Sequence, residues 1–121
     1  MCHWLTLAAA DRRSLAAVRE FGAELAPAEF PRLPEAHAGL QRWLVTSGGC
    51  SCSLLRSASR EALADALTRA RLAAGTLLAH RTFGDAPRGQ RTLAAPERRD
   101  AAAFLASGDD GADRWVFLTA P

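Results

Sequence analysis

The sequence predicts an α+β domain, or a small α/β domain, with elements in the order β-α-β-α-α-β. Three short segments each consist of a polar or basic residue, a tryptophan and β-favouring residues: 3–7, 42–46 and 114–119. Segments with apolar residues at helical spacing lie between them. We therefore expect a small three-stranded sheet, possibly four-stranded, with helices packed on one face.

Length and composition favour a single domain that spans residues 1–121. Apolar residues make up 49% and charged residues 23% of the chain, which is typical of a globular protein. No apolar run approaches the roughly 18 residues of a membrane span. No basic segment precedes the apolar residues 4–10, as it would in a signal peptide. We expect a cytoplasmic protein that does not contact a membrane and keeps its three cysteines reduced.

The basic residues do not indicate a nucleic-acid-binding protein. All fifteen are arginines, they are scattered, and 13 acidic residues lie among them. A nucleic-acid-binding surface would gather its positive charge on one face. The chain also lacks Lys, Asn, Ile and Tyr, whose codons are A/T-rich, so the composition indicates a GC-rich genome and favours a bacterial source.

The first connection is predicted to contain a helix from about Asp11 to Leu25, with Asp11 as its N-cap. The helix would bury a face formed by Leu15, Val18, Phe21 and Leu25. An extended connection with three prolines follows at residues 27–39. If the strands on either side are joined by a β-α-β crossover, they run parallel.

The strongest helix is expected after Ser57 or Ser59. Its apolar stripe consists of Leu63, Leu67, Ala70, Ala74, Leu77 and Leu78. An alternative is that Gly75 ends this helix and that residues 76–83 form a strand. We expect a loop at residues 84–95, a short helix opened by Pro96 and Glu97, and a turn at residues 107–111 before the last strand.

Alternation along the strands predicts two apolar sheet faces. One would carry Leu5, Leu7, Leu44, Val116 and Leu118, and the other Trp4, Trp43, Val45, Trp115 and Phe117. The helices cover one face, so the tryptophan-rich face needs the proline-bearing connection or a second subunit as its cover. The candidate interface residues of a homodimer are therefore Trp4, Trp43, Trp115 and Phe117.

The segment Cys50-Ser51-Cys52 is the strongest candidate for chemistry. In extended backbone, side chains two residues apart point the same way, so both sulfurs can reach one metal ion. Zinc and copper(I) suit thiolates. Cys2 and His3 are the candidates for further ligands, with His37 and His80 as the other soft donors. None of them stands at a recognised motif spacing from the pair.

Strand direction decides whether Cys2 can join this pair. If the first two strands are antiparallel neighbours, Cys2 at the start of one lies near Cys50 at the end of the other, and three cysteines converge. If the strands are parallel, Cys2 lies at the opposite end of the sheet. The crossover argument favours parallel strands and therefore counts against a site with three cysteines.

Two other interpretations of the cysteine segment stay open. A thiol at a helix N-terminus has a lowered pKa and reacts more readily, but a disulfide within Cys50-Ser51-Cys52 is cramped. Free cysteines also fill space as small apolar residues, and this is the simplest interpretation.

The turn before the cysteines is a candidate anion site. Gly48 and Gly49 could present backbone N–H groups to a phosphate or nucleotide, and Arg56 could add charge. The turn lacks the lysine of a P-loop and the full Gly-x-Gly-x-x-Gly pattern, so a plain tight turn is the alternative.

The sequence contains no complete catalytic set, so it does not predict an enzyme. The favoured hypothesis is a small module that acts by binding or self-association. The first alternative is a protein that depends on zinc, copper or a reactive thiol and uses the segment Cys50-Ser51-Cys52. The second alternative is anion binding at Gly48 and Gly49.

Overall fold

The computed structural model describes residues 1–85, 95–107 and 114–121. Within these residues, six strands form one mixed sheet with the order β2-β3-β1-β4-β6-β5. The strands are β1 (Cys2–Ala9), β2 (Glu24–Pro27), β3 (Gln41–Thr46), β4 (Leu78–Gly84), β5 (Glu97–Asp100) and β6 (Val116–Thr119). The helices are α1 (Ala16–Glu20), α2 (Arg60–Ala74) and α3 (Ala101–Ala106), with short 3-10 helices η1 (Arg12–Leu15), η2 (Glu35–His37) and η3 (Ser57–Ser59).

The α+β class is correct, but the prediction of a small sheet with three or four strands is wrong. The three tryptophan-marked segments belong to β1, β3 and β6, and three further strands complete the sheet. Most of the predicted loop at residues 84–95, and most of the predicted turn at 107–111, lie outside the described residues.

Strand β2 begins at Glu24, although the apolar spacing predicts a helix that continues to Leu25. Helix α1 ends at Glu20, and Gly22 has a φ of 107°, which few residues other than glycine adopt. Leu25 therefore enters the core from a strand and not from a helix. Its apolar side chain fitted the helical spacing by coincidence, because a single residue satisfies either periodicity.

Strand β4 confirms the alternative in which Gly75 ends the long helix. The N–H of Gly75 donates to the carbonyl of Arg71 at 2.9 Å, and its φ of 77° terminates α2. Leu77 and Leu78 therefore lie beyond the helix, although they continued its apolar stripe in sequence. Both are fully buried, since β4 lies in the middle of the sheet.

The predicted helix start at Pro96 and Glu97 is wrong, because these residues lead into β5. The helix begins at Ala101, where Asp100 is the N-cap and its carboxylate accepts from the N–H of Ala103 at 2.8 Å. Proline and an acidic residue are common in a first helical turn, but they do not exclude the start of a strand.

Each α-helix joins two strands that run in the same direction. Strand β3 is antiparallel to both β1 and β2, so β1 and β2, which flank α1, are parallel with β3 between them. Helix α2 links β3 and β4 in the same way, and α3 links the parallel neighbours β5 and β6. The first helix does connect parallel strands, but the strand that follows it is β2 and not the segment 42–46. The expected parallel arrangement of residues 3–7 and 42–46 is wrong.

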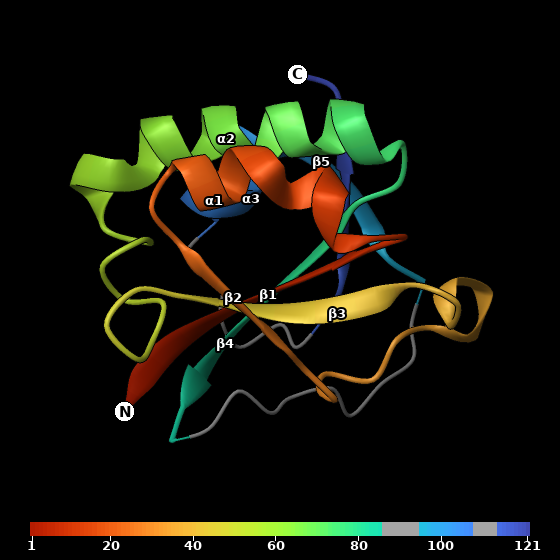
Figure 1. Ribbon diagram of the computed structural model, residues 1–121, viewed down its shortest axis with the longest axis horizontal. Coiled ribbons are helices and arrows are strands. Elements are labelled where there is room, and N and C mark those ends of the chain that lie inside the picture. The colour runs from red at the N-terminus through yellow and green to blue at the C-terminus, as the bar shows by residue number, and fades with distance from the viewer. Residues whose placement is uncertain (86–94, 108–113) are drawn as a thin grey trace.

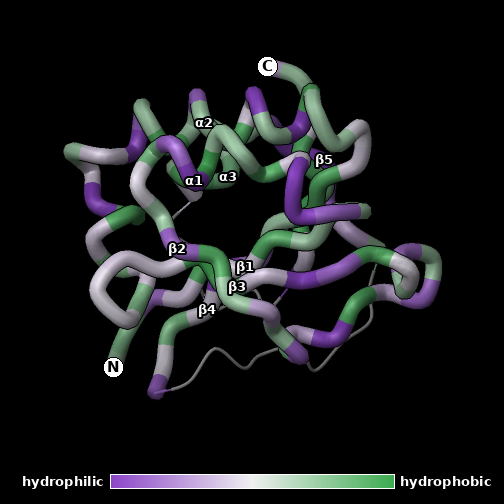
Figure 2. The backbone as a smooth tube through the Cα atoms, viewed as in Figure 1, coloured by the Kyte–Doolittle hydropathy of each residue, from purple (hydrophilic) through white to green (hydrophobic). Residues whose placement is uncertain are grey.

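All three α-helices lie on one side of the sheet (Figure 1). Leu5 and Leu7 of β1 belong to one buried cluster with Leu67 of α2 and Phe104 of α3. Along α2, hydrophilic and hydrophobic residues recur from turn to turn, as expected for a helix with one buried face (Figure 2).

The predicted faces are correct for β1 but wrong for β3. Leu5 pairs with Val45 and Leu7 pairs with Trp43, and directly paired residues share a face. Trp43 and Val45 therefore belong to the helix-covered cluster, and Leu44 lies on the opposite side. Three consecutive apolar residues, 43–45, gave no alternation from which the phase could be determined.

The second face is covered in part by the proline-bearing connection. Leu33 packs in a cluster with Ala8, Leu78 and Trp115, and the indole N–H of Trp115 donates to the carbonyl of Arg32 at 2.9 Å. The proline-bearing connection thus covers part of this face, which is one of the two alternatives that the sequence predicts.

The four candidate interface residues differ in their exposure. Trp43 and Trp115 are each only 3% exposed within their own chain. Trp4 and Phe117 are half-buried. A dimer formed through these residues would depend mainly on the last two.

Candidate metal centre

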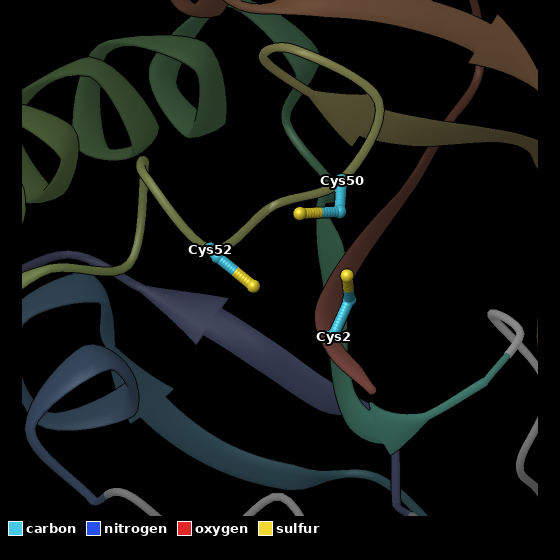
Figure 3. Close-up of side chains that lie close together, drawn as sticks. All are labelled: Cys2, Cys50 and Cys52. Carbon is cyan, nitrogen blue, oxygen red and sulfur yellow. The ribbon is translucent and has the colours of Figure 1, made fainter.

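Three cysteines from two distant parts of the sequence converge at one edge of the sheet. Cys2 begins β1, and Cys50 and Cys52 lie in the loop after β3. The three Sγ atoms all lie within 4.8 Å of one another, and the three side chains point toward a common space (Figure 3). This convergence follows from the antiparallel pairing of β1 and β3, because the start of one strand meets the end of the other.

Ser51 fixes the position of the two loop cysteines. Its side chain is fully buried, and its hydroxyl donates to the carbonyl of Val45 and accepts from the N–H of Leu5 at 2.8 Å. Its own N–H donates to the carbonyl of His3 at 3.0 Å. The anchoring role of Ser51 is not among the predictions made from the sequence. A small polar residue between two cysteines was the available signal, since serine hydroxyls often bond to nearby backbone groups in turns.

The two glycines before the cysteines make a tight turn. Gly48 has a φ of 72° and Gly49 a φ of 98°, which residues with a Cβ rarely adopt. The turn is closed by the N–H of Ser47, which donates to the carbonyl of Cys50 at 2.8 Å. The positive φ values that this turn requires explain why both positions are glycine. Arg56, the third candidate residue for anion binding, is exposed.

Hydrogen bonds within the cluster separate the acidities of the thiols. The thiol of Cys2 donates to Cys50, and this bond, together with burial and the neighbouring Cys52, raises the pKa of Cys2 to about 11. The pKa of Cys50 is lowered, first by the backbone N–H of Cys52 and then by the thiols of Cys2 and Cys52. Cys50 is therefore the more readily ionised of this pair.

Backbone donors also reach the third sulfur. The N–H of His3 donates to Sγ of Cys52 at 3.2 Å. Hydrogen bonds of this kind stabilise the thiolate form, which is the form that binds metals and attacks electrophiles. The site thus combines three sulfurs with backbone N–H groups that donate to two of them.

The three imidazole rings of the chain each pack against an aromatic side chain. The His3 ring packs against Phe83 with centroids 4.7 Å apart. His37 lies against Phe117 at 6.1 Å, and His80 is buried against Trp115 at 5.3 Å. Among the described residues, the converging ligand group consists of the three cysteines and does not include the predicted ligand His3.

The spacing of the sulfurs is close to what a metal ion requires. Four thiolates at about 2.3 Å from a tetrahedral metal are about 3.8 Å apart from one another. The observed limit of 4.8 Å means that shifts of about 1 Å or less would bring the three sulfurs to bonding distance of one ion. The three cysteines can therefore hold a metal ion.

No protein-family model matches the chain, and neither a curated protein nor a solved structure is significantly similar to it. In the parts of the chain that the structure describes, no helix is both long enough and apolar enough to cross a membrane.

Proposed function

We propose that this protein binds a thiophilic metal ion, zinc or copper(I), through Cys2, Cys50 and Cys52. The observation that carries the proposal is the convergence of the three Sγ atoms within 4.8 Å. Two of the ligands are held by a buried serine and the third by the start of a sheet strand. Soft thiolate ligands select zinc and copper(I) from the biologically available metals.

The protonation states of the thiols agree with a metal site. Cys50 has a lowered pKa and is the first of the Cys2–Cys50 pair to become a thiolate. Cys2 keeps its proton to higher pH, so an ion that binds all three sulfurs must displace that proton. Because metal ligation requires deprotonated cysteines, the affinity should increase with pH over the range in which Cys2 ionises.

Elemental analysis tests the proposal most directly. The full chain would be produced without a metal-affinity tag, loaded separately with zinc and with copper(I) under reducing conditions, and desalted. We expect about one equivalent of metal per chain. Each single substitution to serine, at Cys2, Cys50 or Cys52, should lower the affinity at least tenfold.

Ser53→Ala is a matched control in the same loop. Its hydroxyl makes only a long contact of 3.5 Å with the carbonyl of Ser47, so metal binding should be unchanged. The proposal is wrong if the wild type retains neither metal. It is also wrong if the cysteine variants retain as much metal as the wild type.

A further inference from the structure

We infer that the ion bound at this site is copper(I), held by three thiolates in a three-coordinate arrangement. The inference rests on the proposed function and specifies its ligand. It depends on two observations: the number of ligand atoms that the chain supplies and the exposure of the site.

The chain supplies three soft ligands at this place. Every cysteine and histidine of the sequence lies within the described residues. In these residues, the group of converging ligand atoms is limited to Cys2, Cys50 and Cys52, and no carboxylate joins them. The nearest histidine in sequence, His3, directs its backbone N–H to Cys52 while its ring packs on Phe83.

Coordination preference separates the two candidate metals. Protein-bound zinc is almost always four-coordinate, and structural zinc sites take all four ligands from the protein. Copper(I) is a soft ion that thiolates bind strongly, and three sulfurs satisfy it. A site with three sulfurs and no fourth ligand among the described residues satisfies copper(I) as it stands, whereas zinc would need an exogenous ligand.

The spacing of the sulfurs is compatible with this choice. Three sulfurs in a plane around a metal at about 2.3 Å are about 4.0 Å apart, whereas tetrahedral geometry draws them to about 3.8 Å. The three Sγ atoms lie within 4.8 Å of one another, so small movements reach either arrangement. Ser51 restrains such movement, because its hydroxyl is tied to both Leu5 and Val45.

The cluster lies at the surface edge of the sheet and not in the core. All three cysteines are half-buried, so a bound ion stays within reach of solvent on one side. Zinc at this site would complete its coordination with water or another exogenous ligand. Copper(I) has no such requirement, and the backbone N–H groups of Cys52 and His3 donate to the sulfurs of Cys50 and Cys52.

X-ray absorption spectroscopy on the untagged full chain, loaded anaerobically with one equivalent of copper(I), tests the inference. We expect three sulfur neighbours around copper and two in the Cys2→Ser variant. When copper(I) and zinc are supplied in equal amounts, copper should be retained. A copper shell of two sulfurs that is unchanged in Cys2→Ser, or retention of zinc in the competition, would overturn the inference.

The variant His3→Gln separates three protein ligands from four. It removes the imidazole and keeps the backbone N–H that reaches Cys52, so the metal shell should not change. Loss of a nitrogen neighbour in this variant would show that histidine is a ligand and would contradict the inference. Far-ultraviolet circular dichroism of each variant confirms that it is folded.

These measurements also separate this inference from the proposed function. If only zinc is bound, with a fourth non-sulfur ligand, the metal-binding function stands and the choice of copper(I) is wrong. If neither metal is retained by the wild type, both are wrong.

Discussion

The backbone N–H of Leu5 donates a hydrogen bond of 2.8 Å to the hydroxyl of Ser51, and this bond joins β1 to the loop that carries Cys50 and Cys52. The same hydroxyl donates to Val45 in β3. Leu5 and Val45 are themselves cross-strand partners. One buried oxygen therefore ties the cysteine loop to both strands that define the site.

Substituting Ser51 by alanine should destabilise the protein by about 1–3 kcal/mol, because the Leu5 N–H loses its acceptor in a buried environment. Urea unfolding followed by tryptophan fluorescence measures the change. The control Ser53→Ala removes only a long hydroxyl contact and should stay within about 0.5 kcal/mol of the wild type. Equal stability of the two variants would show that Ser51 does not anchor the loop.

Substituting Gly49 by alanine should cost about 1–2 kcal/mol, because a Cβ is strained at a φ of 98°. Apart from its chain neighbours, no atom of the described residues lies within 4 Å of the added Cβ, so the cost comes from the backbone and not from a clash. Gly39→Ala is the matched control. It also has open space and lacks a positive φ, so its stability should change by less than about 0.5 kcal/mol. Thermal unfolding compares the two.

The same substitution at Gly49 bears on the alternative of anion binding. If the glycines serve only the turn, millimolar phosphate or nucleotide should not raise the melting temperature of the wild type. A phosphate-dependent increase that disappears in Gly49→Ala would support an anion site and would show that the turn has a second role.

Much of the sheet could be predicted from the sequence, but its size and directions could not. The segments marked by tryptophan are strands because β-branched and aromatic residues favour extended backbone. Strand β2 was missed because its four residues include Leu25, whose spacing also suited a helix. Strand β5 is formed by the polar residues 97–100, which carry no alternation of apolar side chains.

The candidate site could likewise be predicted only in part, because its geometry depends on strand direction. The sequence identified Cys50 and Cys52 as a pair and identified the antiparallel arrangement as the condition for Cys2 to join them. The condition is met, since Leu5 pairs with Val45 in antiparallel register. The relative direction of β1 and β3 could not be derived from the sequence. Nothing in the sequence indicated that the first helix leads into an additional strand, β2, which pairs with β3.

Substituting Leu67 by alanine should destabilise the protein by about 2–5 kcal/mol, because its fully buried side chain packs α2 onto the sheet. Leu72→Ala, on the same helix, is the control. That side chain is 69% exposed, so the change should be about 0.5 kcal/mol or less. Similar losses for both variants would contradict the assignment of the buried face.

The stability of the metal-free protein should fall between about pH 9 and pH 11. The folded state raises the pKa of Cys2 from 9.0 to about 11, so it holds this proton more tightly than the unfolded chain does. The stabilisation is fully present below pH 9 and is lost as the pH rises toward 11. The chain has neither lysine nor tyrosine, so the cysteines are the side chains that titrate in this window.

Urea unfolding at pH 8, 9, 10 and 11 with a reducing agent measures this dependence. The Cys2→Ser variant lacks the titrating group and should lose less stability over the same range. Parallel curves for the wild type and the variant would show that the Cys2 thiol is not held in its protonated form by its neighbours.

The two thiols should also differ in their reaction with iodoacetamide. The thiolate is the reactive form, so Cys50, whose pKa is lowered, should be alkylated before Cys2 at pH 7.5. Both side chains are half-buried, so exposure alone does not predict this order. Timed quenching and peptide mass spectrometry would follow each residue, and in denaturant the two rates should become similar. Faster alkylation of Cys2 in the folded protein would contradict the hydrogen-bond arrangement in which its thiol donates to Cys50.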